Sequence, residues 1–309
     1  MKRLIAFALI LALLLGGCGS SGPEDLTKAF QPSPDREVNS IGYGPVIADF
    51  GIRLLEQTME PGENTLLSPL SIITALSMTA NGADGETLRQ MEDVLGADLG
   101  QLNPILGAIQ ERSGQETVMA NSIWIKDTPT LAVSDSFLQT NADWYGAGIF
   151  REPFDDATLG KINRWVEENT DGQIKDILDR IDPDAVMYLV NGLSFDAKWE
   201  CPYEGHQVFD RSFTTENGEK RTVSMMYSEE GQYLKTEKAS GFLKYYEGRR
   251  YAFAALLPEE GTTVVELVRS LDGAVLREVL TDPQEITVHA AIPKFETGSE
   301  AELKDVLTE

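Results

Sequence analysis

The chain has 309 residues, of which 42% are hydrophobic and 8% aromatic, enough apolar material to bury a sizeable core in one large or two ordinary domains. Asp and Glu number 50 against 26 Lys and Arg, so the formal net charge is −24. Because nucleic acids and heparin bind clustered basic side chains, this balance argues against both as partners. The densest basic group, Lys244, Arg249 and Arg250, is expected to be a solvated strand end and turn.

Residues 1–17 have the pattern of an export signal. Lys2 and Arg3 precede an apolar run from Leu4 to Leu15 that is short for a membrane span, and small residues follow. The ending LLGGC resembles the lipobox of bacterial lipoproteins, which implies that Cys18 is acylated and anchors the chain to a membrane. The protein is then expected in the cell envelope, facing outside the cytoplasm, or in the extracellular space. An ordinary signal peptide cut elsewhere, with Cys18 incidental, is the alternative.

Residues 18–40 are rich in Ser, Pro, Gly and charged side chains, a composition typical of a flexible linker. They are expected to form a lipidated N-terminus and a flexible tether. The tether would present a globular domain, residues 41–309, away from the membrane surface.

The stretch Asn64–Gly96 predicts a short apolar strand, a turn and two helices, after a first helix that ends at Thr58. Ser68 immediately precedes Pro69, which fits an N-cap followed by proline at the first helical position. The helix that follows has few polar positions, so it should be buried on nearly all sides. The next helix is amphipathic and is closed by Gly96.

Apolar periodicity and turn residues predict the remaining elements. Strands are expected at 117–126, 185–195 and 285–295, and the second should be a central strand because its apolar residues hardly alternate. A small strand is expected within 144–154, and Asn217–Gly218 indicates a hairpin. Helices are predicted at 101–112, 134–142, 161–178, 264–271, 273–280 and 299–307.

Several motif blocks are spread through the globular part. They are SPLSI and NGA-x-G-x-T within 68–87, ANSIWI at 120–125, WVEENT-x-GQI at 165–174, SMMY at 224–227, ALLPEEGTTVVEL at 255–267 and PKF at 293–295. In this order they resemble the serpin family, whose members are mainly serine protease inhibitors. The resemblance covers about residues 41–308 and implies a single α+β domain, with helices clustered around a large central mixed β-sheet and smaller β-sheets beside it.

The resemblance implies that the protein inhibits a protease and is not itself an enzyme. In the family, a serine protease (or a cysteine protease) cleaves an exposed bait loop, which then inserts into the main sheet as an added strand and traps the protease. The hinge, the bait loop and the last strands of the family pattern are expected beyond Glu309, so the sequence is expected to be a C-terminally truncated or incomplete chain. No bait residue is assigned, and a monomer is expected. The alternative is a non-inhibitory or degenerate serpin-fold lipoprotein.

Four residues match positions at which the family's main sheet opens. Ser68 and Ser71 at the start of the buried helix, together with Asn191 on the strand at 185–195, match the shutter region. Trp199 matches the breach, where the bait loop first enters the sheet. Small hydroxyls and an amide could exchange hydrogen bonds as strands part. Ordinary structural roles explain each residue equally well. These roles are a helix cap for Ser68, a small packing residue for Ser71, a hydrogen-bonded buried amide for Asn191 and a core aromatic for Trp199. The family's shutter histidine is expected beyond residue 309.

The sequence carries no pattern for catalysis or for a metal or cofactor. His206 and His289 are the only histidines, no Cys/His cluster is present, and the motifs of hydrolases, metalloproteases and nucleotide-binding proteins are missing. Cys201 precedes Pro202 with no close basic neighbour and is expected to be an inert thiol.

Overall fold

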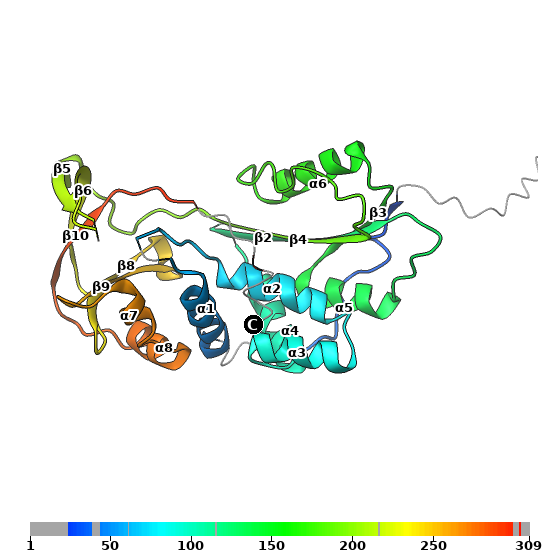
Figure 1. Cartoon of the computed structure of the whole chain (residues 1–309), viewed down its shortest axis with the longest axis horizontal. Coiled ribbons are helices and arrows are strands. Elements are labelled where there is room, and N and C mark those ends of the chain that lie inside the picture. Colours follow the sequence, from blue (N-terminus) through cyan, green and yellow to red (C-terminus); the bar gives the residue numbers. More distant parts are fainter. Residues whose placement is uncertain are drawn as a thin grey trace, which may run out of the picture.

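The computed structural model describes residues 24–38, 44–60, 62–114, 116–215, 217–298 and 303. The predicted signal peptide, Cys18 and most of the helix predicted at 299–307 lie outside the described residues. In the described part, no helix combines the length and apolar character that a membrane crossing needs. The molecule is elongated, with a main sheet at one end and two smaller sheets at the other (Figure 1), and the predicted α+β class is confirmed.

The main sheet has four strands in the order β1-β3-β2-β4. Their bounds are Glu24–Asp25 (β1), Thr117–Lys126 (β2), Gly148–Glu152 (β3) and Met187–Phe195 (β4). β2 runs parallel to β3 and antiparallel to β4, and Asn121 lies directly opposite Asn191. Among the described strands, β4 pairs with β2 alone.

A group of helices lies below the main sheet in Figure 1. It comprises α1 (Gly44–Thr58), α2 (Pro69–Ala80), α3 (Gly85–Leu95), α4 (Leu99–Glu111) and α5 (Asp135–Tyr145). α2 contacts β4, and its Ile73 and Met78 are fully buried. Burial on nearly all sides, as predicted from the sequence, is not observed, because Leu70, Ile72 and Leu76 are only partly buried and Thr79 is exposed. The strand predicted before Ser68 is wrong, because residues 64–68 are irregular and lead directly into the cap of α2.

Helix α6 (Asp156–Asn169) covers the opposite face of the main sheet (Figure 1). Its Trp165 packs with Trp124 of β2 in a second apolar cluster. The helix predicted at 161–178 is thus observed at 156–169, so it begins and ends earlier than expected. It stops before Gly172, whose φ of 74° lies in the left-handed region that a continuing helix does not use.

Two three-stranded antiparallel sheets form the other end of the molecule, in the orders β10-β6-β5 and β7-β8-β9. The strands are β5 (Val208–Thr214), β6 (Lys220–Glu230), β7 (Tyr233–Lys235), β8 (Ala239–Tyr245), β9 (Ala252–Pro258) and β10 (Val288–Pro293). Two short helices, α7 (Val264–Val268) and α8 (Gly273–Thr281), contact α1, and two 3-10 turns are η1 (Gly205–Gln207) and η2 (Glu247–Arg249). The hairpin predicted at Asn217–Gly218 is confirmed and joins β5 to β6.

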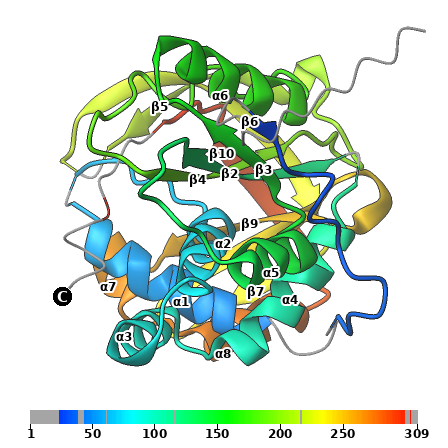
Figure 2. The ribbon, with the colours of Figure 1, turned by 90° about the vertical axis from the view of Figure 1, so that its right-hand side faces the viewer.

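The segment 24–38, which was expected to belong to a flexible tether, is docked on the domain instead. Its β1 extends the main sheet beside β3, and Leu26 and Phe30 pack against the main apolar core. Figure 2 looks onto the end that carries β3 and shows this segment descending beside α5 and α4. Composition predicted a linker because the segment has few large apolar residues, namely Leu26, Phe30 and Val38, among many small, polar and charged ones. Leu26 and Phe30 can be recognised as anchors only when the core surface against which they pack is known.

Candidate functional site

Ser68 and Ser71 form a hydrogen-bonded pair at the N-terminus of α2. The Ser68 hydroxyl donates to Ser71 Oγ at 2.9 Å and accepts from the Ser71 backbone N–H at 3.4 Å. Ser68 is thus an N-cap, as its position before Pro69 predicts. Both side chains are partly buried, and α2 lies against β4. The pair places two hydroxyls, which can each donate and accept, at the helix end under the main sheet.

Asn191 lies in a chain of amide hydrogen bonds that crosses the main sheet. Asn191 Nδ2 donates to Asn121 Oδ1 at 2.7 Å across the β2–β4 pair. Asn121 Nδ2 in turn donates to the Tyr145 carbonyl at 2.8 Å and to Gln110 Oε1 at 3.3 Å. Asn191 Oδ1 is buried and has no hydrogen-bond partner among the described residues. Because an unpaired buried acceptor is costly, this oxygen is the point at which the chain of bonds can gain a donor.

The same polar path continues from Tyr145 into the helices. The Tyr145 hydroxyl donates to Asn103 Oδ1 at 2.6 Å, and Asn103 and Asn81 exchange amide hydrogen bonds at 2.9 and 3.1 Å. Burial strongly raises the pKa of the Tyr145 phenol, which therefore stays protonated and can donate. The path thus joins β4, β2, α5, α4 and the end of α2 in one buried network.

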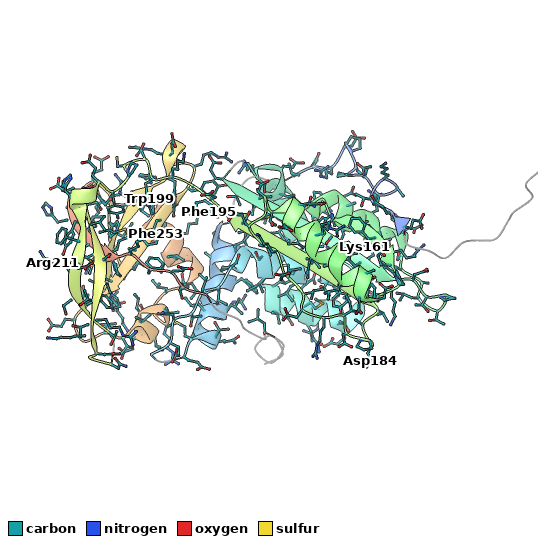
Figure 3. The ribbon with its side chains drawn as sticks, turned by 90° about the horizontal axis from the view of Figure 1, so that it is seen from above. Lys161, Asp184, Phe195, Trp199, Arg211 and Phe253 are labelled. Carbon is teal, nitrogen blue, oxygen red and sulfur yellow. The ribbon has the colours of Figure 1, made fainter. Side chains whose placement is uncertain are left out.

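Trp199 stands beyond the end of β4 in an aromatic and charged cluster, separate from the two serines. Its ring stacks on Tyr246 with centroids 4.3 Å apart and meets Phe253 edge-on at 5.9 Å. Figure 3 shows Trp199 beside Phe253 of β9, with Phe195 at the end of β4 facing them. Trp199 therefore links the chain that follows β4 to Tyr246, the residue after β8, and to Phe253 of β9.

A buried ion pair supports this cluster. The Lys244 ammonium lies 2.7 Å from Glu230 Oε1, and the exposed fractions of the two side chains are 3% and 11%. The same ammonium sits 4.6 Å from the ring centroid of Tyr203 and 5.6 Å from that of Trp199. The expectation of a solvated Lys244 is wrong, because the side chain turns inward between sheets to meet a carboxylate on β6.

The other basic residues near this point are also paired. Arg249 lies 2.7 Å from Glu200, and Arg250 lies 3.3 Å from Glu116. Lys244, Arg249 and Arg250, predicted to be the densest basic group, therefore each pair with a different carboxylate. In the described part of the chain, no group of three or more metal-ligating side chains is gathered. Cys201 is exposed.

The structure brings only part of the predicted set together. Among the described residues, no hydrogen bond links the Ser68–Ser71 pair to Asn191, and Trp199 belongs to a different cluster. Sequence reasoning missed Asn121, the direct partner of Asn191. The available signal was an amide in the middle of an otherwise apolar strand, since such a group needs a buried partner.

The chain is similar to known proteins in sequence. The family model described as serpin (serine protease inhibitor) matches residues 45–309. An uncharacterized serpin-like protein of Thermococcus kodakarensis is 25% identical, with 99% of this chain and 78% of the relative covered. Human neuroserpin is 26% identical over 84% of this chain and 69% of its own length.

Solved structures give the same result. The crystal structure of a thermophilic serpin, tengpin, in the native state matches with a TM-score of 0.85 and 37% identity. The match covers 93% of this chain and 76% of that one. Because the family model spans most of the chain and the fold agrees throughout, the chain belongs to the serpin family.

Proposed function

We propose that the protein is a serine-type endopeptidase inhibitor that acts by suicide-substrate trapping. The target protease cleaves a bait loop, which joins the main sheet as a new strand before the acyl-enzyme is hydrolysed. Membership of a family of protease inhibitors supports the inhibitor class. The bait residue is not assigned to any position of the printed sequence.

The family match is the observation that carries the proposal. The serpin family model covers residues 45–309, and the sheet that an inserted strand would join is present with the strand order β1-β3-β2-β4. In the described part of the chain, β2 is the only strand paired with β4. In the proposed mechanism, the added strand joins the main sheet by ordinary backbone pairing.

The candidate site residues have distinct parts in this mechanism. Asn191 holds β4 to β2 through Asn121, and its free Oδ1 can accept a bond from an arriving donor. Ser68 and Ser71 can exchange their mutual bond for others as the sheet moves over α2. Trp199 stacks where the loop would first enter, and its contacts with Tyr246 hold the chain after β4 to the residue that follows β8.

We further propose that residues 1–17 are an export signal and that Cys18 carries the lipid anchor of an envelope protein facing outside the cytoplasm. A Cys18→Ala variant tests the anchor. It should leave the membrane fraction, whereas Cys201→Ser, a matched substitution of the other cysteine, should remain there. Normal processing and membrane retention of Cys18→Ala would contradict the proposal.

Inhibition is tested on the protein purified from its native membrane, after its intact mass and C-terminal peptide have been measured. We expect a 1:1 complex that resists SDS when the protein meets a trypsin-like or subtilisin-like protease. The control is the same protease blocked at its catalytic serine, which cannot acylate and should give no such complex. Cleavage of the protein without any complex would overturn the inhibitory mechanism and favour a non-inhibitory serpin.

A further inference from the structure

The N-terminal segment 24–38, called the strap from here on, is held to the domain at several points along its length. At its start, the Leu26 backbone N–H donates to the Ile149 carbonyl at 2.8 Å, and Ile149 N–H donates to Thr27 Oγ1 at 2.9 Å. In its middle, Ser33 N–H donates to Asp143 Oδ1 at 2.7 Å. The strap therefore behaves as part of the folded domain from its first described residues.

Apolar and ionic contacts complete the docking. Leu26 and Phe30 are the two strap side chains that pack against the main core. Near the far end, Arg36 lies 2.6 Å from Glu111 of α4, and its side chain is only 19% exposed. Polar and apolar contacts thus alternate along the strap, which leaves little freedom for it to act as a linker.

The strap begins at one end of the long axis of the molecule. Glu24 pairs with Arg151, the penultimate residue of β3, and their side chains lie 3.3 Å apart. β3 and β2 run parallel, so this is the end of the sheet at which β2 finishes, far from Phe195, which pairs with the first residue of β2. Figure 1 shows β3 at one end of the molecule and β5, β6 and β10 at the other.

We propose that docking of the strap shortens the connection between the membrane and the domain to residues 18–24, called the leash from here on. The short leash sets the orientation of the protein on the membrane. The inference rests on the proposed lipid anchor at Cys18. From Cys18 to Glu24 the chain has 24 − 18 = 6 residues, which reach about 20 Å when fully extended. Had the tail been free up to α1 at Gly44, 44 − 18 = 26 residues would reach about 90 Å.

The orientation follows from this difference in reach. The end that carries Glu24 is held next to the bilayer, and the insertion end of the main sheet, marked by Phe195 and Trp199, points away from it. Figure 3 shows Asp184 and Lys161 near the leashed end and Arg211 at the opposite one. The leash therefore keeps the end at which a cleaved loop would enter the main sheet away from the lipid.

Energy transfer to an acceptor lipid in vesicles tests the orientation. The lipidated protein carries a donor dye on a single cysteine in a Cys201→Ser background. The dye is placed either by Asp184→Cys, exposed near the leashed end, or by Ser212→Cys, exposed on β5 at the far end. We expect transfer from position 184 to exceed that from position 212 several-fold.

Two variants test whether the strap causes this difference. A Gly/Ser insertion of about 20 residues between Ser21 and Gly22 adds roughly 25 Å of average reach without touching the strap, and should bring the two transfer efficiencies close together. Leu26→Asp/Phe30→Asp should undock the strap and do the same. The control Ala29→Asp/Pro32→Asp adds the same charge at exposed strap positions and should leave the difference intact.

The outcomes separate the leash from the anchor. Equal transfer from positions 184 and 212 at the natural spacing, with the protein still on the vesicles, overturns the leash and leaves the anchor standing. A difference in transfer between the two positions that is unchanged after the Gly/Ser insertion also overturns the leash. The insertion variant tests the leash even where the double aspartate variant does not fold. Protein that stays in solution whether or not Cys18 is present overturns the anchor, and the leash with it.

Discussion

Replacing Glu230 by Gln is expected to destabilise the protein strongly through its partner Lys244. The substitution keeps the shape of the side chain but removes the carboxylate that lies 2.7 Å from an ammonium whose side chain is 3% exposed. A buried charge left without its partner costs about 3–5 kcal/mol. The rings of Tyr203 and Trp199 would still face the ammonium, so we expect the lower part of this range.

The effect can be measured as a loss of thermal stability. In a chain of this size, about 1 kcal/mol corresponds to roughly 2 °C in Tm, so Glu230→Gln should lower Tm by about 6 °C or somewhat more. The matched control is Glu56→Gln, which breaks an ion pair with Arg269 whose side chains are 63% and 43% exposed. Such a surface pair is worth up to about 1 kcal/mol, or about 2 °C.

A second variant distinguishes the cost of leaving the Lys244 charge unpaired from the cost of lost packing. Lys244→Met/Glu230→Gln removes both charges and should recover most of the Tm, because a buried ion pair replaced by apolar groups is often nearly neutral. Circular dichroism on heating would follow all three proteins. A Tm of Glu230→Gln no lower than that of Glu56→Gln would refute the reasoning, as would a double variant at least as unstable as the single one.

Four further changes are expected to give measurable effects in the same unfolding assay. Asn191→Ala should cost about 1–3 kcal/mol, because it leaves a buried amide oxygen on β2 unpaired. Ser68→Ala should cost about 1 kcal/mol through loss of the α2 cap, and Ser68→Thr should retain most of it. Burial raises the pKa of Tyr145, so the contribution of its neutral phenol to the free energy of unfolding is full below the unfolded pKa of about 10 and falls as pH rises further. Tyr145→Phe should remove this loss of stability at alkaline pH. The hydrogen bond from the backbone N–H of residue 158 lowers the pKa of Asp155. The ionised cap of α6 therefore stabilises the fold above the unfolded pKa of about 4, and this stability is lost as pH falls through the lowered pKa. Asp155→Asn should abolish this dependence of stability on acid pH.

Features encoded by neighbouring residues were predictable. The cap at Ser68, the α2 helix with its buried Ile73 and Met78, and the turn at Gly218 each depend on residue types a few positions apart, and the structure confirms all three. The ordered motif blocks likewise indicate the family from the sequence alone, and they mark Asn191 and Trp199 as positions of interest. Local signals survive in the sequence because their physical causes act within one or two turns of chain.

Partners far apart in the chain could not be predicted in this way. Asn191 bonds to Asn121, which lies 191 − 121 = 70 positions earlier, and the register that brings them together is set by the whole β2–β4 pair. Lys244 was expected in solvent but is buried, since a carboxylate on another strand compensates its charge. Only the tertiary structure decides such pairings, because burial of a charge or an amide depends on what the rest of the fold places beside it.

The N-terminal tail shows the same division most clearly. Its composition by itself determined that it is polar, short of apolar residues and without secondary-structure periodicity, which together predict a linker. The tertiary structure decided that residues 24–38 are docked, since the open edge of β3 and the apolar surface beside α5 provide partners for Leu26 and Phe30. A segment is a tether or a strap according to the surface it meets, and that surface is assembled from elements more than a hundred residues away.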